Sequence, residues 1–154
     1  MSIVLKNKCR HDRSRVVSID YGTKRVGLSV ADPLRLFAQP FGVYSPASAV
    51  EKLVSFHHTE TIGTIVIGWP LNEDGSEGKA TRRVENYIRQ LSNRLPDTKI
   101  IRWDERHTSE EAKARLSELH IRPEAGEVDQ MAASIILQEF LDAHSETTRV
   151  NERS

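Results

Sequence analysis

The stretch of sequence that decides the fold is residues 16–31, VVSIDYGTKRVGLSVA. Its first five residues are mostly β-branched and apolar, which is typical of a strand, and the YGTK that follows is typical of a turn. Residues 25–30 then predict a strand that returns beside the first, and residues 36–43 predict a third. We therefore expect the chain to open with three antiparallel strands.

The rest of the chain alternates helical and strand patterns. Ser45 and Pro46 predict a helix start, as N-cap and first helical residue, and that helix runs to about residue 58. Residues 64–68 (TIVIG) and 99–105 predict strands buried on both faces, with a helix between them that stops at Pro96. Two more helices are expected at 108–121 and 127–143. The order βββαβαβαα indicates one α/β domain with a mixed five-stranded sheet flanked by helices.

Length and composition fit a single cytoplasmic domain. The 154 residues suit one core, and the charge is balanced, with 22 Lys plus Arg against 22 Asp plus Glu. A polyanion would therefore have to bind at a local patch. The single cysteine, Cys9, cannot form an internal disulfide, and no apolar run is long enough to cross a membrane, so we expect no membrane contact. The domain is expected over residues 15–144, between flexible tails at 1–14 and 145–154.

Three acidic residues stand where a carboxylate is energetically costly unless a cation holds it. Asp20 ends the first predicted strand, Glu105 ends the last one, and Asp129 lies in the first turn of the last predicted helix. Only the fold can bring such distant residues together. Asp104 competes with Glu105 for the same role, because adjacent residues of a strand face opposite sides. We choose Glu105 for its longer reach and leave Asp104 as a structural acid.

Three converging carboxylates would form a site for Mg²⁺ or Mn²⁺ rather than Zn²⁺, whose sites favour Cys and His. The six histidines show no metal-ligand spacing. Enzymes in which carboxylates hold one or two such ions hydrolyse phosphodiester bonds. In these sites the metal activates water and stabilises the leaving oxygen. The expected chemistry is that of a nuclease. Each acid taken alone also has an ordinary structural explanation, since Asp is common at turns and in first helical turns.

Four short motifs follow one another along the chain: residues 19–27 (IDYGTKRVG), 66–75 (VIGWPLNEDG), 104–109 (DERHTS) and 128–138 (VDQMAASIILQ). Together they resemble the YqgF family of bacterial proteins, which are similar to Holliday junction resolvases and are also described as pre-16S ribosomal RNA nucleases. The resemblance covers about residues 15–143. Trp69 stands where leucine is more usual in the family, and His107 stands where an apolar residue is common.

The resemblance implies an RNase H-like fold and a cytoplasmic, metal-dependent nuclease that acts at the 5′ end of precursor small-subunit ribosomal RNA. It also implies acidic site positions at Asp20, Glu105 and Asp129. We chose the same three positions above, because an unpaired carboxylate is energetically costly beside buried apolar residues.

Basic residues lie close in sequence to the proposed acids. We predict that six of them bind nucleic-acid phosphates: Lys24, Arg25, Lys79, Arg82, Arg83 and Arg106. For the three that begin the helix after residue 78, a solvated helix face with ordinary ion pairs is an equal alternative. Only Tyr21 and Trp69 are aromatic residues near the site, so recognition of backbone and shape is expected rather than base reading.

The sequence leaves other functions open. Branched DNA is an alternative substrate, and a non-catalytic module that binds RNA or a ribosome is another reading. Residues 20–23 also resemble the first phosphate loop of actin-like sugar kinases and ATPases. Those proteins bind ATP between two such domains, whereas a chain of 154 residues is long enough for only one. We expect a nucleic-acid partner, precursor RNA with or without a ribosomal precursor particle, and a monomer or weak homodimer.

Overall fold

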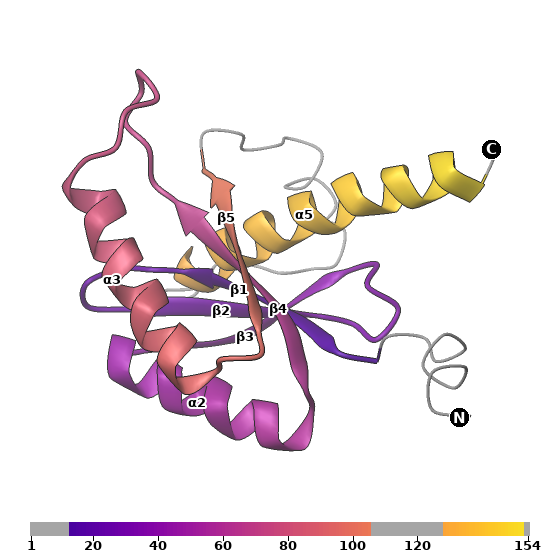
Figure 1. Ribbon diagram of the computed structural model, residues 1–154, viewed down its shortest axis with the longest axis horizontal. Coiled ribbons are helices and arrows are strands. Elements are labelled where there is room, and N and C mark those ends of the chain that lie inside the picture. The colour runs from indigo at the N-terminus through magenta and orange to yellow at the C-terminus, as the bar shows by residue number, and fades with distance from the viewer. Residues whose placement is uncertain (1–12, 106–127, 153–154) are drawn as a thin grey trace.

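A computed structural model describes residues 13–105 and 128–152, and within the last helix it describes the side chains of residues 131–144. One sheet of five strands forms the centre of the molecule, in the spatial order β3-β2-β1-β4-β5 (Figure 1). The strands are β1 Arg15–Asp20, β2 Val26–Ala31, β3 Ala38–Tyr44, β4 Ile62–Trp69 and β5 Lys99–Asp104. The first three pair antiparallel, and β1, β4 and β5 pair parallel. The predicted α/β class with a mixed five-stranded sheet is confirmed.

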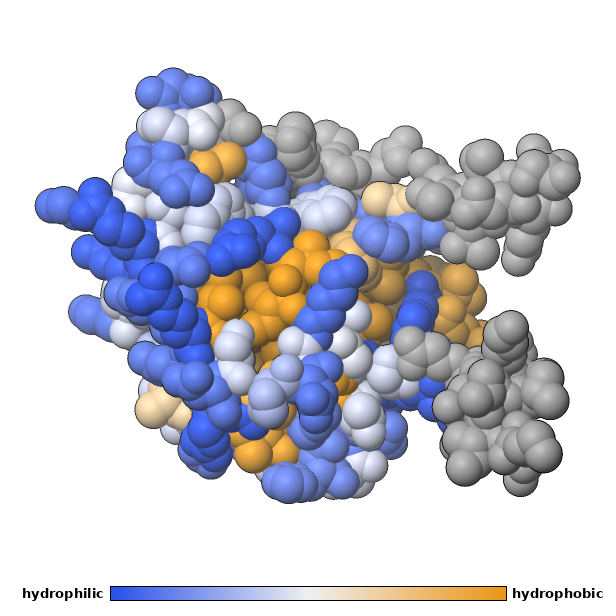
Figure 2. All heavy atoms as spheres, in the orientation of Figure 1, coloured by the Kyte–Doolittle hydropathy of each residue, from blue (hydrophilic) through white to orange (hydrophobic). Residues whose placement is uncertain are grey.

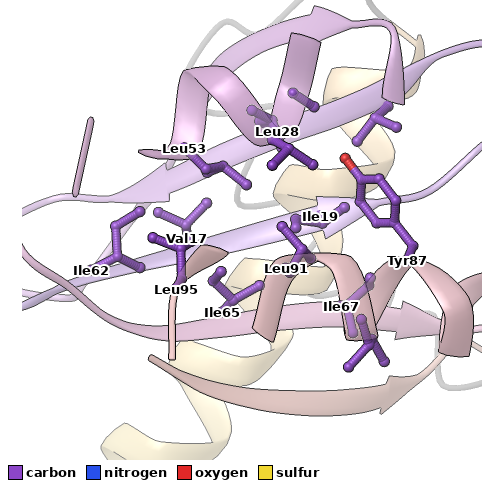
Figure 3. Packing of buried hydrophobic residues seen from close by; sticks show 14 of the residues in the cluster. Val17, Ile19, Leu28, Leu53, Ile62, Ile65, Ile67, Tyr87, Leu91 and Leu95 are labelled. Carbon is purple, nitrogen blue, oxygen red and sulfur yellow. The ribbon is translucent and has the colours of Figure 1, made fainter. Parts of the chain in front are cut away.

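Helices cover both faces of the sheet. On one face lie α2, Pro46–Thr59, and α3, Lys79–Arg94, whose apolar side chains pack with those of β1, β2 and β4 in one buried cluster (Figure 3). On the other face α5, Val128–Glu152, packs against a second cluster built on Val16, Val66 and Leu137. The alternation of side chains along each strand therefore supplies two separate cores.

The start of α2 follows from two residues. Ser45 accepts a hydrogen bond on its side-chain oxygen from the backbone N–H of Ser48 at 3.2 Å, and Pro46 occupies the first turn. The Pro46 carbonyl also accepts a hydrogen bond from the Tyr87 hydroxyl of α3 at 2.8 Å. The predicted helix start is confirmed, and the same residue ties the two helices together.

Small and polar residues hold α5 close to the sheet. Ser18 Oγ of β1 donates to the carbonyl of Ala133 at 2.6 Å, and Ser134 Oγ donates to Ser29 Oγ at 3.1 Å. Gln138 is fully buried and accepts a hydrogen bond from the backbone N–H of Ala38 at 3.0 Å. These contacts hold α5 in one position against β1, β2 and β3. They therefore determine which α5 residues lie near the end of the sheet.

The last helix extends beyond its predicted end at residue 143 and continues to Glu152. Residues 144–152 contain neither glycine nor proline, so no residue there stops a helix. Most of the predicted N-terminal tail and all of the helix expected at 108–121 lie outside the described residues. Among the helices described, none combines the length and the apolar character needed to cross a membrane.

Candidate active site

Two of the three proposed acids meet at the carboxyl end of the parallel strands. Asp20 is the last residue of β1, and Glu105 directly follows β5. The strand between them, β4, pairs with both, so their carboxyl ends lie at the same edge of the sheet (Figure 1). The side chains of Asp20 and Glu105 interact, since Asp20 affects the pKa of Glu105, and both residues line the same two hollows. The fold thus brings into contact two carboxyl groups that are far apart in the sequence.

Strand alternation decides which acid of β5 faces this point. Trp103 pairs in register with Gly68 and packs in the cluster under α5, whereas Asp104 pairs with Trp69, which packs on the opposite face. Glu105 returns to the α5 face. Asp104 therefore occupies a position on the α3 side of the sheet, and Glu105 is the residue that reaches Asp20.

Gly68 of β4 makes room for the Glu105 side chain. A Cβ atom at this position would lie 2.2 Å from Glu105 Oε1 and 3.0 Å from Ile136 Cδ1 of α5. Any side chain at residue 68 would therefore compete with the carboxylate for the same space. The glycine is a structural requirement of the acid pair.

The surroundings of Glu105 favour its protonated form. Burial raises the pKa of the Glu105 carboxyl, the hydrogen bond with Asp20 opposes this, and the negative charge of Asp104 raises the pKa further. Two carboxyl groups in such contact either share a proton or are held by a positive charge. Their arrangement is thus suited to binding a cation.

The acid pair opens onto hollows on two sides. One, of about 250 Å³, is lined by both acids, by the turn after β1 and by Arg83 near the start of α3. The other, of about 300 Å³, is lined by both acids and by Ala132, Ile136 and Glu139 of α5. A substrate therefore has access to the carboxylates at the end of the sheet.

The other predicted site residues lie around this point or outside the described residues. Lys24 and Arg25 are exposed in the connection between β1 and β2, and Lys79 and Arg82 are exposed in the first turns of α3. Arg106 and the Asp129 side chain lie outside the described residues, although position 129 belongs to the first turn of α5. Within the part of the chain that the structure describes, no group of three or more His, Cys, Asp or Glu side chains is arranged to hold a metal ion.

The model of a protein family described as "RuvX: Holliday junction resolvase" matches residues 14–143. The chain belongs to the RuvX family. Two relatives, each named "Putative pre-16S rRNA nuclease", come from Salinibacter ruber, 48% identical over 84% of this chain and 93% of its own length, and from Chlorobium luteolum, 37% identical over 84% and 95%. The predicted family and its nuclease class are thus confirmed.

Solved structures support the fold. The RuvC protein of Thermus thermophilus, in a structure described as a complex with a Holliday junction substrate, matches with a TM-score of 0.59 at 12% identity, over 86% of this chain and 96% of that one. A second RuvC structure from the same organism gives a TM-score of 0.60. This likeness establishes that the RuvX chain has the RNase H-like fold.

One acid beside the pair was missed by sequence reasoning. Glu139 of α5 is buried, lines the hollow that contains Asp20 and Glu105, and accepts a hydrogen bond from the indole N–H of Trp103 at 2.9 Å. The sequence does contain a signal, because Glu139 lies in the mostly apolar stretch ILQEFL, residues 136–141, directly before Phe140 and Leu141. A carboxylate in an apolar helix is as unusual as one at the end of a buried strand.

Proposed function

We propose that this RuvX chain is a nuclease that depends on Mg²⁺ or Mn²⁺ and hydrolyses phosphodiester bonds in precursor small-subunit ribosomal RNA. The observation that carries the proposal is the contact between Asp20 and Glu105 at the accessible edge of the sheet. Two negative charges in contact are unfavourable unless a cation lies between them, and carboxylate oxygens are the ligands that Mg²⁺ and Mn²⁺ prefer.

The residues present fit such a cation. Asp20 and Glu105 supply hard oxygen donors, and Gly68 leaves the space that the Glu105 carboxylate occupies. Position 129 precedes Ala132 by three residues, a spacing that puts both positions on one side of α5, and Ala132 lines the hollow of the acid pair. Asp129 is therefore our choice for a third ligand. A bound divalent ion would lower the pKa of a water molecule and stabilise the leaving oxygen.

Basic residues around the pair would hold the substrate strand. Arg83 lines the same hollow as both acids, and Lys24 and Arg25 are exposed in the turn that follows Asp20. Guanidinium and ammonium groups bind phosphate oxygens and so place a phosphodiester beside the carboxylates. In the hydrolysis, water adds to phosphorus, the bond from phosphorus to the leaving oxygen breaks, and that oxygen takes a proton.

The choice of substrate rests on the relatives, whose names specify pre-16S rRNA. We place the cleavage at the 5′ end of that precursor, on free RNA or in a ribosomal precursor particle, in the cytoplasm, by a monomer or a weak homodimer. The family description, a Holliday junction resolvase, favours branched DNA as the second candidate substrate.

The test is cleavage by purified protein of an end-labelled precursor RNA fragment and, separately, of a four-way DNA junction, with Mn²⁺, Mg²⁺ or EDTA. We expect cleavage of the RNA that EDTA stops and that Asp20→Asn, Glu105→Gln and Asp129→Asn each abolish. The control is Asp104→Asn, one residue from Glu105 but on the opposite face of β5, which should retain activity. Equal cleavage by wild type and Asp20→Asn would reveal a contaminant and refute the proposal. Cleavage of the junction alone would establish the second candidate.

A further inference from the structure

A third hollow lies near the acid pair, on the face of the sheet that α3 covers. It has a volume of about 410 Å³ and lies between α3 and the ends of β4 and β5. Its lining residues are Trp69 and Arg102 of the strands, Glu77 just before α3, and Thr81, Arg82, Glu85 and Arg89 of α3. It adjoins the acid pair, because the backbone N–H of Glu105 donates to the Trp69 carbonyl at 3.4 Å.

In the wall of this hollow a guanidinium group lies over an indole ring. Arg102 Cζ lies 4.9 Å from the centre of the Trp69 ring, and Trp69 packs in turn against the buried cluster under α2 and α3. Arg102 Nη2 also donates a hydrogen bond to Glu85 Oε2. The Trp69 ring and the Glu85 carboxylate thus both contact the guanidinium, and the Arg102 side chain is 45% exposed.

The charges around this guanidinium group suit a nucleotide. Three arginines, Arg82, Arg89 and Arg102, line the hollow against two glutamates, Glu77 and Glu85. Glu85 is paired with Arg102, and Arg82 and Arg89 are exposed on α3, so one positive charge remains in excess beside the ring. Figure 2 shows hydrophilic residues gathered along the side of the molecule that α3 forms. A base stacks on an arginine plane or an aromatic ring, its phosphate pairs with arginine, and a volume of about 410 Å³ is within the range of small-ligand sites.

We propose that this hollow binds an unpaired nucleotide of the substrate strand, with its base stacked on the Arg102 guanidinium above Trp69 and its phosphate held by Arg82 and Arg89. The inference rests on the proposed function, because the ligand is part of the strand that the acid pair cleaves. It also revises an expectation from the sequence: Trp69 supports base contact, whereas backbone and shape recognition alone was expected. The protein thereby requires a single-stranded segment next to its cleavage site.

The test compares the binding of two dye-labelled strands by fluorescence anisotropy in EDTA, where no cleavage occurs. One strand is single-stranded RNA, and the other is a sugar-phosphate chain of the same length without bases. Because a base stacked on an aromatic ring or a guanidinium strengthens binding, the wild type should bind the RNA about 10-fold more tightly than the baseless strand. Trp69→Leu and Arg102→Lys should lose this preference while keeping most of their affinity for the baseless strand.

Two variants serve as comparisons. Arg102→Lys keeps the charge and changes an exposed side chain, so it tests the stack even if Trp69→Leu folds poorly. Arg94→Lys is the matched control. Arg94 is the last residue of α3, its side chain is also 45% exposed, and it is also paired with a glutamate, Glu51 of α2. Arg82→Gln should keep the base preference and reduce the slope of log affinity against log salt concentration by about 0.7.

The outcomes separate the two proposals. A wild type that cleaves precursor RNA but binds both strands equally overturns the nucleotide site and leaves the nuclease standing. A base preference that Arg102→Lys removes and Arg94→Lys keeps supports the site, even where no substrate is cleaved. An equal loss of preference in Arg94→Lys and Arg102→Lys overturns it, because the effect would then follow from any exposed arginine.

Discussion

Replacement of Gly68 by alanine should lower the rate of cleavage strongly and the stability of the fold only slightly. The new Cβ would lie 2.2 Å from Glu105 Oε1, whereas ordinary van der Waals contact begins at 3.4 Å, so the carboxylate oxygen must move by about 1.2 Å. That oxygen is the end of a flexible side chain, and it can move without disturbing the sheet. A displacement of roughly 1 Å in a reacting group can lower a rate by about 100-fold. We therefore expect cleavage by Gly68→Ala to fall by about 100-fold.

The stability of the same variant should change little. The added methyl group also meets Ile136 Cδ1 at 3.0 Å, a tight contact in a packed region. Overpacking of a core costs about 1–3 kcal/mol, and the low end applies here because Glu105 can yield. For a domain of this size about 1 kcal/mol corresponds to a fall in Tm of roughly 2–4 °C, which calorimetry resolves.

Gly63→Ala is the matched control, on the same strand but at its other end. A Cβ at position 63 would lie 2.2 Å from Ser14 Oγ and 2.7 Å from Ser14 Cβ, which is attached to the backbone, and far from the acid pair. It should lower the Tm by at least as much as Gly68→Ala, because Ser14 Cβ cannot move without the backbone, and it should leave cleavage unchanged. Wild-type activity in Gly68→Ala, or an equal loss of activity in both variants, would refute the argument that Gly68 places the Glu105 carboxylate.

Three further predictions concern stability and are measured by urea unfolding. Glu139→Ala removes the acceptor of the Trp103 indole N–H and should cost about 1–3 kcal/mol, whereas Glu139→Gln keeps an oxygen acceptor and should cost less; equal losses would rule out this bond as the cause. Leu91→Ala empties a fully buried position of α3 and should cost about 2–5 kcal/mol at an unchanged m-value; a loss below about 1 kcal/mol would contradict the packing. Tyr87→Phe removes the hydroxyl that donates to the Pro46 carbonyl and should cost about 0.5–1.5 kcal/mol, and no change would show that water replaces the bond.

Elements set by neighbouring residues could be predicted from the sequence. The α2 start needs only a serine that caps the helix and a proline suited to its first turn, and both are local properties of Ser45 and Pro46. The contact of Arg102 with Trp69 could not be predicted in this way. The two residues are 33 positions apart, and they meet because β4 and β5 pair in parallel with Ile67 opposite Arg102. Such contacts follow from register, which no short stretch of sequence contains.

The choice between Asp104 and Glu105 depends on the same register and has a physical reason in β5 itself. One face of the strand carries Ile101, Trp103 and then Glu105, and the other carries Arg102 and Asp104. A slip of one residue would turn Arg102 toward the apolar side chains under α5 and would leave Trp103 without its contacts to Phe140 and Glu139. Burying the unpaired Arg102 guanidinium there would cost more free energy than the placement of Asp104 beside Asp20 could recover. The indole of Trp103 therefore fixes the face of the strand, and with it the position of Glu105 beside Asp20.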